Sequence, residues 1–335
     1  MEKTFADLGR VEAIRQLFEG SGYEPFEEPL HVDAKAGDRI FSASRILSEG
    51  IDFNLVYFPL KHLGHKAVTV VAGELYAALA SPCTVSVVLG ISAKLDFERI
   101  SELWSGVVAA CREYGIKSVS LDLQPSRNGL FISVSMTGIC SKLTLVRRPK
   151  AQSKDLICVS GQLGAAYLGQ AVLERAARKF DALSQQPSLE QYRMMVGACL
   201  KPELPASILT QLEDSDIYPS HGYLVTRGLA DAVLALSRDS GLGAKIYADK
   251  IPFEGGSFSL GKELDIDPVS AAMNGGDDCK LLFTIPILKL EKFRKDFQTF
   301  DIIGHLARPE VGAVLVTPEG VELPLSAQGW NRQTQ

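Results

Sequence analysis

The spacing of hydrophobic residues predicts alternating helices and strands over the first 80 residues. Residues 5–20 carry apolar side chains at helical spacing, which predicts an amphipathic helix. Residues 39–44 and 51–57 alternate between apolar and polar side chains, which predicts two strands. In residues 60–80, β-branched residues favour a strand and the alanines after them favour a helix, and we predict a buried helix.

The pattern continues to the end of a first α/β unit near residue 145. Residues 84–91 are apolar and β-branched, which predicts a buried strand. Asp96 is a suitable N-cap for the helix that follows, and Gly115 is a suitable stop. Residues 118–123 and 130–139 predict two more strands, joined by a stretch rich in turn formers.

A second unit begins at residues 155–161, a predicted strand that runs through a glycine-containing turn into a helix ending near residue 183. The remaining predicted elements are a helical stretch at 192–200, a helix at 228–237, strands at 244–247 and 281–285, a helix at 288–297 and a hairpin at 313–321. This order fits two α/β domains with mixed strand connections better than one doubly wound sheet. We predict domains at residues 1–148 and 149–330.

Composition is that of a globular protein with a full hydrophobic core. The 335 residues are 46% hydrophobic and 22% charged, and the net charge is −5. The basic cluster at residues 147–150 is short and is expected to be a solvated linker. Nucleic acid is therefore not an expected partner.

Six cysteines are scattered without metal-binding spacing, mostly inside apolar runs, which is typical of a reduced protein. The first residues lack the apolar core of a signal peptide, and no apolar run approaches the roughly 20 residues of a membrane span. We therefore expect a cytoplasmic protein with no membrane partner.

Common catalytic motifs are absent: the sequence has no GxSxG, Walker or GxGxxG pattern. His62 and His65 are three residues apart but have no third ligand, so packing is their expected role. The turn Ser160 to Gly164 lies between a predicted strand and a predicted helix, where backbone N–H groups and the helix dipole can bind phosphate. An ordinary tight turn explains it equally well.

A second candidate ligand site is the stretch NGGDDCKLLF, residues 274–283. Its glycines permit positive φ and close approach of a ligand, and its two carboxylates can bind a cationic ligand or a hard metal ion. A strand-entry turn with solvated acids accounts for the same residues. Composition and spacing leave the function open.

Taken together, four segments resemble the thiamine-monophosphate kinase family, part of the aminoimidazole ribonucleotide synthetase (PurM-like) superfamily. They are residues 48–53 (SEGIDF), 57–67 (YFPLKHLGHKA), 155–167 (DLICVSGQLGAAY) and 274–283 (NGGDDCKLLF). The likeness runs in the same order from about Phe5 to Gly320.

The resemblance implies a two-domain PurM-like α/β fold, with an N-terminal mixed-sheet, ATP-binding domain and a C-terminal α/β domain. It also implies a homodimer formed mainly by the N-terminal domains, with ATP near that interface. The family reaction transfers the γ-phosphoryl group of ATP to thiamine monophosphate and gives thiamine diphosphate. Family aspartates gather magnesium ions, which offset phosphate charge during the transfer.

The chain departs from the family pattern at these acids. One family carboxylate falls on Arg45, and the element matched by residues 224–229 loses both of its acids and contains Arg227. A family histidine becomes Asp52. The acids that match are Asp33, Glu74 and Asp122, and they form the predicted remnant of the metal site. Neutral variation does not explain changes concentrated on acids while the flanking segments still match.

The resemblance also assigns roles to the remaining candidate residues, without a catalytic one. The predicted nucleotide or phosphate contacts are Arg45, Glu49, Gly50, Asp122, Gly161, Gly164 and Arg227. The predicted substrate contacts are Gly275, Gly276, Asp277 and Asp278. The expected cofactors are ATP and Mg²⁺, and a small phosphorylated ligand is an expected partner.

Three functional hypotheses follow. In the first, the chain is a kinase homologue whose catalysis is weak or lost because most metal-binding acids are replaced. In the second, it is an active phosphotransferase in which Arg45 and Arg227 contact phosphate directly, since arginine binds phosphate in a bidentate manner. In the third, it is a non-catalytic regulatory protein that pairs through its N-terminal domain with itself or with an active relative.

Overall fold

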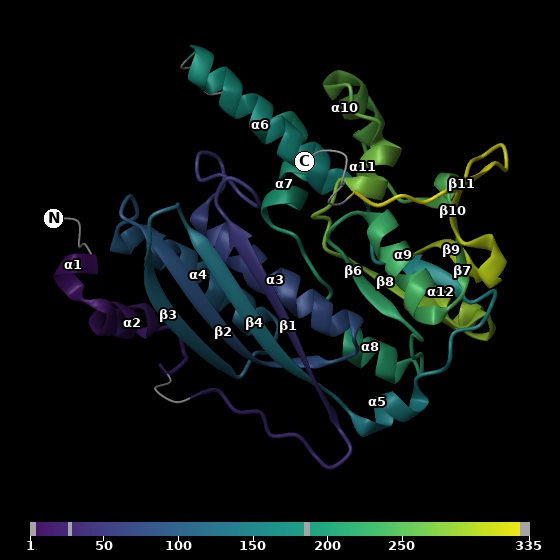
Figure 1. Ribbon diagram of the computed structural model, residues 1–335, viewed down its shortest axis with the longest axis horizontal. Helices are drawn as coiled ribbons and strands as arrows, with labels where there is room; N and C mark the ends of the chain where they lie inside the picture. Colours follow the sequence, from purple (N-terminus) through teal and green to yellow (C-terminus); the bar gives the residue numbers. More distant parts are fainter. Residues whose placement is uncertain (1–4, 26–28, 184–187, 329–335) are drawn as a thin grey trace. The chain divides into compact units, whose positions relative to one another are not determined.

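The computed structural model describes residues 5–25, 29–183 and 188–328 (Figure 1). The chain divides into two compact units, residues 1–145 (unit 1) and residues 146–335 (unit 2). Each unit contains one mixed β-sheet with helices packed against it. The predicted α/β fold class, with mixed strand connections in both halves, is confirmed.

Unit 1 is built on a four-stranded sheet in the order β1-β4-β2-β3. Strand β4 pairs antiparallel with β1 and β2, and β2 pairs parallel with β3. Helix α3 packs on the sheet and against α4. The elements are α1 (Phe5–Leu8), α2 (Arg10–Phe18), β1 (Arg39–Ser48), α3 (Leu60–Ala77), β2 (Ser81–Ser92), α4 (Phe97–Glu113), β3 (Ser118–Ser126) and β4 (Phe131–Cys140), followed by α5 (Lys142–Arg147) at the unit boundary.

Helices α3 and α4 cross where each of them has a glycine. A Cβ atom on Gly64 would lie 2.0 Å from the carbonyl oxygen of Leu103, and one on Gly106 would lie 1.9 Å from the carbonyl oxygen of Lys61. The two backbones approach this closely because no side chain stands between them. Both glycines are therefore required by packing.

Gly106→Ala is expected to destabilise the protein by about 1–3 kcal/mol, because the added methyl group forces the two helices apart. The higher helix propensity of alanine offsets only part of this loss. Denaturant unfolding measures the effect. The control is Ser105→Ala on the exposed side of α4, which should change stability by less than about 0.5 kcal/mol. Equal stability of both variants would contradict the close crossing.

Two predictions in unit 1 are corrected by the structure. The helix predicted at residues 5–20 is divided into α1 and α2 at Gly9, whose φ is +71°. The strand predicted at residues 51–57 is wrong, because this segment is a turn. Asp52 accepts the N–H of Ser48 at 2.8 Å and Asn54 accepts that of Val56 at 2.9 Å. Such side-chain bonds to the backbone compete with strand pairing.

Two other predictions in unit 1 are confirmed. Residues 60–77 form the buried helix α3, despite their β-branched stretch. Asp96 caps α4, since its carboxylate accepts the N–H of Arg99 at 2.8 Å.

Unit 2 is built on a seven-stranded sheet in the order β11-β10-β7-β9-β5-β8-β6. The pairs are antiparallel except β10 with β7. The strands are β5 (Leu156–Val159), β6 (Gly222–Val225), β7 (Gly243–Tyr247), β8 (Lys280–Ile285), β9 (Asp301–Ala307), β10 (Ala313–Val316) and β11 (Glu322–Pro324). The α-helices are α6 (Ala165–Leu183), α7 (Arg193–Leu200), α8 (Ile208–Asp214), α9 (Leu229–Ser240), α10 (Ser257–Leu264), α11 (Pro268–Asn274) and α12 (Leu290–Asp296). Short 3₁₀ turns are η1 (Glu190–Tyr192), η2 (Ala248–Lys250), η3 (Ile287–Lys289) and η4 (Pro309–Val311).

Two of the hydrophobic clusters in unit 2 lie next to the β5–α6 turn. The larger lies between the sheet and α9 and includes Val159, Val233 and Ile246, all fully buried. The smaller joins α6 to α7, α10 and α11 through residues such as Leu168 and Met195. Together they place the β5–α6 turn between the sheet and the helical cluster.

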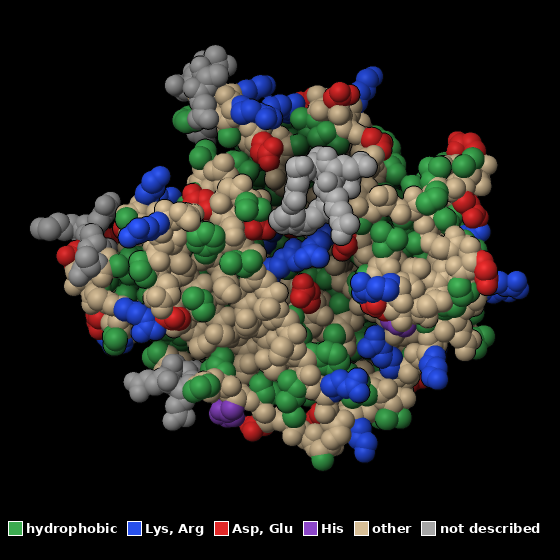
Figure 2. Space-filling view, viewed as in Figure 1, with side chains coloured by type: hydrophobic (Ala, Val, Ile, Leu, Met, Phe, Trp, Pro, Cys, Tyr) green, Lys and Arg blue, Asp and Glu red, His purple; other side chains and the backbone are tan. Residues whose placement is uncertain are grey.

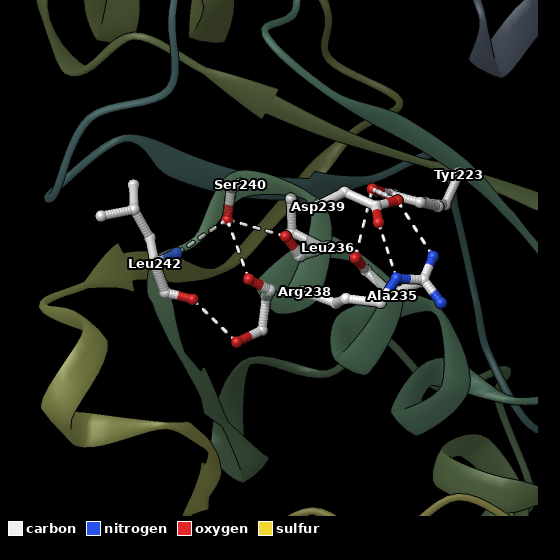
Figure 3. A network of polar contacts seen from close by, with 8 residues as sticks. Tyr223, Ala235, Leu236, Arg238, Asp239, Ser240 and Leu242 are labelled. Atoms are coloured by element: carbon white, nitrogen blue, oxygen red, sulfur yellow. Dashed lines mark hydrogen bonds and ion pairs between the residues drawn. The ribbon is translucent and has the colours of Figure 1, made fainter.

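Helix α9 ends in a compact network of hydrogen bonds (Figure 3). The hydroxyl of Ser240 donates to the carbonyl of Leu236 at 2.7 Å and accepts the N–H of Leu242 at 3.2 Å. The hydroxyl of Tyr223 donates to Asp239 at 2.8 Å, and burial raises the pKa of Tyr223. These bonds satisfy polar groups at the helix end, so the network has a structural role.

The strand predictions in unit 2 missed β6 and β9. In β9, Gly304 interrupts the apolar run, and a Cβ atom there would lie 2.0 Å from the carbonyl oxygen of Lys245 on β7. The close approach of β7 therefore requires glycine at this position of β9, and the same glycine weakens the strand pattern in the sequence. The helices predicted after β5 and at residues 228–237, and the terminal hairpin, are all observed.

The surface carries charges of both signs. On the face shown in Figure 2, acidic and basic side chains are interspersed with hydrophobic and polar ones. No described helix combines the length and the apolar character that a membrane crossing requires. The six cysteines are free thiols, and all but Cys83 are buried.

Candidate functional site

In unit 1, two arginines lie against acids that were predicted to bind metal. The guanidinium of Arg45 on β1 lies 4.0 Å from the carboxylate of Glu74 on α3. Arg10 at the start of α2 donates from Nε to Asp122 Oδ1 at 2.9 Å, and its Nη2 contacts the same oxygen. Arginine therefore supplies positive charge at both acids.

The carboxylate of Asp122 is held by several donors at once. Besides Arg10, it accepts the side-chain amide of Gln124 at 3.0 Å and the backbone N–H of Leu123 at 2.8 Å. The hydrogen bonds from Gln124 and Arg10 hold the pKa of Asp122 below its usual range. The residue is therefore an ionised acceptor at neutral pH, with protein donors on both oxygens.

Asp33, the third predicted metal ligand, is exposed in the segment before β1. Within residues 5–25, 29–183 and 188–328, no three His, Cys, Asp or Glu side chains are grouped so that they could hold a metal ion. The structure thus does not gather Asp33, Glu74 and Asp122 into such a group.

Glu49 and Gly50 close the turn that follows β1. One carboxylate oxygen of Glu49 accepts the N–H of Leu130 at 2.8 Å. The backbone N–H of Gly50 donates to Phe53 at 2.8 Å, and its φ of +84° favours glycine. Both residues tie this turn together, and Glu49 also lines a cavity of about 290 Å³.

A larger cavity, of about 610 Å³, lies beside the Arg10–Asp122 pair. It is lined from α1 and α2 by Phe5 and Arg10, and from the ends of β2 and β3 by residues that include Ile91 and Gln124. Its volume is in the range of small-molecule sites. Its lining combines apolar side chains with the charged Arg10, Lys94 and Asp96.

In unit 2, Asp278 of the NGGDD stretch lies at the first turn of α6. Its two carboxylate oxygens accept the N–H of Gly164 at 2.8 Å and the N–H of Ala166 at 3.2 Å. The side chain is buried, and burial raises its pKa to about 7. The helix N-terminus predicted to bind phosphate therefore already binds a carboxylate of the same chain.

The glycines of the stretch pack against neighbouring backbone and side chains. A Cβ atom on Gly275 would lie 2.6 Å from Cβ of Tyr167. Gly276 has a φ of +88°, and a Cβ there would lie 2.9 Å from the carbonyl oxygen of Thr226. Asp277 donates its backbone N–H to the same carbonyl at 2.9 Å. The turn that precedes β8 therefore requires both glycines for packing.

The structure brings some of the other predicted residues close to this stretch. Gly161, with a φ of +121°, lies under the side chain of Lys280. Arg227 is exposed, and its Cα lies 3.6 Å from where a Cβ on Gly276 would stand. Gly161, Gly164, Arg227 and residues 275–278 therefore belong to one region of unit 2, at the ends of β5, β6 and β8.

Arg10 was not among the site residues predicted from the sequence. It lies in a predicted amphipathic helix 112 residues before its partner Asp122, and no motif connects them. Only the packing of α2 beside β3 brings the two together.

Comparison with known proteins shows which proteins this chain is similar to. Residues 31–140 match the family described as "AIR synthase related protein, N-terminal domain". The thiamine-monophosphate kinase of Aquifex aeolicus is 23% identical over 285 residues, which cover 85% of this chain and 87% of that protein.

Two solved structures share the fold over nearly their whole length. AaThiL complexed with AMPPCP and TMP matches with a TM-score of 0.73 at 20% identity, covering 95% of this chain and 96% of that one. HypE of E. coli, a hydrogenase maturation protein, matches with a TM-score of 0.72 at 18% identity, covering 97% and 99%. The predicted two-domain PurM-like fold is thereby confirmed. Residues 31–140 therefore match an AIR synthase-related domain, and over most of its length the chain is similar to thiamine-monophosphate kinases, with which it shares the PurM-like fold.

Proposed function

We propose that this chain is a thiamine-monophosphate kinase homologue that binds an ATP-type nucleotide in unit 1 and transfers its phosphoryl group weakly or not at all. The observation that carries the proposal is the pairing of Glu74 with Arg45 and of Asp122 with Arg10. Phosphoryl transfer in this family is expected to need Mg²⁺ at these acids. Here, each of the two acids has a cation of the protein beside it.

The size of the electrostatic term supports this interpretation. Two unit charges about 4 Å apart interact by roughly 4 kcal/mol at an effective dielectric constant near 20. Where the family carries a carboxylate and this chain carries Arg45, the interaction with a divalent cation changes from attraction to repulsion. Magnesium also requires several oxygen ligands in octahedral geometry. The acids that match the family, Asp33, Glu74 and Asp122, are few for a site of this kind.

The cavity of about 610 Å³ in unit 1 is the proposed nucleotide site. AaThiL has been solved with AMPPCP, an ATP analogue, which supports nucleotide binding in this fold. Lys94 lines the cavity and supplies positive charge for phosphate, while Phe5, Ile91 and Leu123 offer apolar surface for a base.

Calorimetry with AMPPCP, with and without Mg²⁺, tests this proposal. The wild-type chain is expected to bind AMPPCP with an affinity that Mg²⁺ leaves nearly unchanged, because Arg45 and Arg10 oppose metal binding at their partner acids. The matched variant Arg45→Asp restores a carboxylate, so its affinity should rise when Mg²⁺ is added. Absence of AMPPCP binding under both conditions would rule out a retained nucleotide site.

A second candidate function is an active phosphotransferase in which an arginine, Arg227, contacts phosphate directly. Arg227 favours it: the side chain is exposed, and within the described part of the chain no protein group is bonded to it. In this version Arg227→Gln lowers AMPPCP affinity by about tenfold or more, because a charged hydrogen bond is lost. Unchanged affinity in this variant eliminates the second candidate.

We also propose that the chain forms a homodimer through unit 1. Strand β1 is an edge of the four-stranded sheet, and Ile40 and Ile46 on it are 51% and 56% exposed. An exposed edge strand with apolar side chains favours pairing with another chain. Light scattering is expected to give the mass of two chains for the wild type and of one chain for Ile46→Lys. A wild-type monomer at high concentration would refute the dimer and would leave the nucleotide proposal intact.

A further inference from the structure

Residues 5–23, the N-terminal arm, form one side of the cavity of about 610 Å³ in unit 1. Phe5 on α1 and Arg10 at the start of α2 are the residues of the arm that line it. Helix α2 packs beside β3, an edge strand of the four-stranded sheet (Figure 1). The cavity is therefore bounded on this side by a segment that lies outside the sheet.

The second half of the arm is fixed to unit 1 by buried contacts. Leu17 and Phe18 are buried, and the ring of Phe18 lies 5.1 Å from that of Trp104 on α4. After the end of α2, the hydroxyl of Tyr23 donates to the carbonyl of Ile116 at 3.0 Å. Opening this half would expose apolar side chains and break long-range bonds, so it stays in place when the native protein fluctuates.

Contacts nearer the surface hold the first half of the arm. The ring of Phe5 lies edge-on to the ring of Phe97, with the centroids 6.0 Å apart, and both side chains are only partly buried. The side chains of Arg10 and Asp122, which form an ion pair, are 55% and 36% exposed. Exposed ion pairs contribute little to stability and are screened by salt. The first half of the arm therefore opens more readily than the second.

Gly9 separates the two helices of the arm. Its φ of +71° and ψ of 158° lie in a region that glycine adopts almost alone, and a Cβ atom there would meet nothing within 4 Å. Backbone conformation, and not packing, therefore requires glycine here. The N–H of Gly9 donates to the carbonyl of Phe5 at 2.9 Å, and the N–H of Ala13 donates to the carbonyl of Gly9 at 3.0 Å. Because helical bonds continue on both sides, rotation at Gly9 alone would join α1 and α2 into one helix.

We propose that α1 is a lid on this cavity, with Gly9 as its hinge and with Arg10 fixing its base to Asp122. In the bent, closed form, Phe5 packs on Phe97 and lines the cavity. In the straight, open form, α1 continues the axis of α2, as the helical spacing of residues 5–20 favours, and Phe5 leaves the cavity. Each form has interactions that the other lacks, which is what a two-state element requires. As regulation of the nucleotide site, the inference rests on the proposed function, but the movement of the lid needs no nucleotide.

Thiol labelling of the full chain with a maleimide tests the lid without a ligand. Ile91→Cys places a thiol in the wall of the cavity, where the native side chain is 9% exposed. Cys83 is the internal standard: it is partly exposed, the other five native cysteines are buried, and it lies near the opposite end of β2. The labelling rate of the introduced thiol relative to Cys83 measures how often the lid opens. Ser126→Cys, which lines the same cavity, is the second probe if Ile91→Cys does not fold.

Three variants are expected to open the lid. Gly9→Ala should raise the relative labelling rate about tenfold or more, because alanine is strained in the bent form and favours the continuous helix. Arg10→Gln and Asp122→Asn should each raise it about two- to fivefold, the effect of losing an exposed ion pair. The double variant should show no further increase, since both substitutions remove the same interaction. Added KCl should speed labelling when Arg10 is present and should have no such effect in Arg10→Gln.

Arg15→Gln is the matched control, because Arg15 pairs with Glu12 inside α2 and its loss should leave the labelling rate unchanged. The lid is overturned if Gly9→Ala is labelled at the wild-type rate relative to Cys83, or if Arg15→Gln speeds labelling as much as Arg10→Gln does. These results are read without nucleotide, so they stand whether or not AMPPCP binds. For a chain that binds AMPPCP, regulation by the lid predicts dissociation about tenfold faster or more in Gly9→Ala, and an unchanged dissociation rate would refute that regulation.

Discussion

Asp278→Ala is expected to lower the free energy of unfolding at neutral pH by about 2–6 kcal/mol, because two N–H groups lose their acceptor and each unsatisfied buried group costs about 1–3 kcal/mol. These are the N–H groups of Gly164 and Ala166 at the start of α6, bonded to the carboxylate at 2.8 and 3.2 Å. Denaturant unfolding measures the loss. The matched control is Asp277→Asn, the neighbouring acid, which is half-buried and should have a much smaller effect.

Asp278 is also expected to change how the stability of the protein depends on pH. Burial raises its pKa from 3.8 to about 7, so the folded state binds a proton more tightly than the unfolded state does. Stability from this group is therefore full below the unfolded pKa and falls as pH rises from about 4 to about 7, by about 1.4 kcal/mol per unit of pKa shift. Asp278→Asn cannot titrate, so its stability should lack this decline. A wild-type profile parallel to that of Asp278→Asn would show that Asp278 does not titrate in this range.

Helices and strands were predicted correctly from the sequence where the local residue pattern agrees with the fold. The helix at residues 60–77 was predicted correctly because helix formers in its second half, such as Ala72 and Leu75, outweigh the β-branched residues before them. The strand predicted at 51–57 failed because Asp52 and Asn54 form bonds with the nearby backbone, and the alternation of side chains does not reveal this. Strand β9 was missed because its glycine, which the close approach of the neighbouring strand requires, interrupts the apolar pattern.

In the candidate site, too, local pattern predicted part of the outcome and contacts distant in sequence decided the rest. The sequence identified NGGDD as a special turn and left open whether it binds a ligand or only begins a strand. The structure gives its glycines packing roles and binds Asp278 to α6. This answer depends on contacts between Asp278 and residues 112–114 positions away, and no pattern within the stretch contains them.

The sequence could not predict which residues, far apart in the chain, lie next to each other in the structure. The resemblance predicts that Arg45 replaces a family acid, but nothing in the sequence predicts the approach of Arg10 to Asp122. Lys280 and Arg193 likewise come from separate elements that meet around one cavity. In each case the charge was evident from the sequence and the residues beside it were not.

Formation of thiamine diphosphate from ATP, Mg²⁺ and thiamine monophosphate is the most direct test of the proposed loss of catalysis. The purified chain is expected to react at least about a thousandfold more slowly than the Aquifex aeolicus kinase, because metal ions contribute several kcal/mol to such transition states and each 1.36 kcal/mol is tenfold in rate. A cooperative thermal transition of the same sample establishes that it is folded. Turnover within about tenfold of the Aquifex enzyme, a difference of only about 1.4 kcal/mol in activation free energy, would contradict the account.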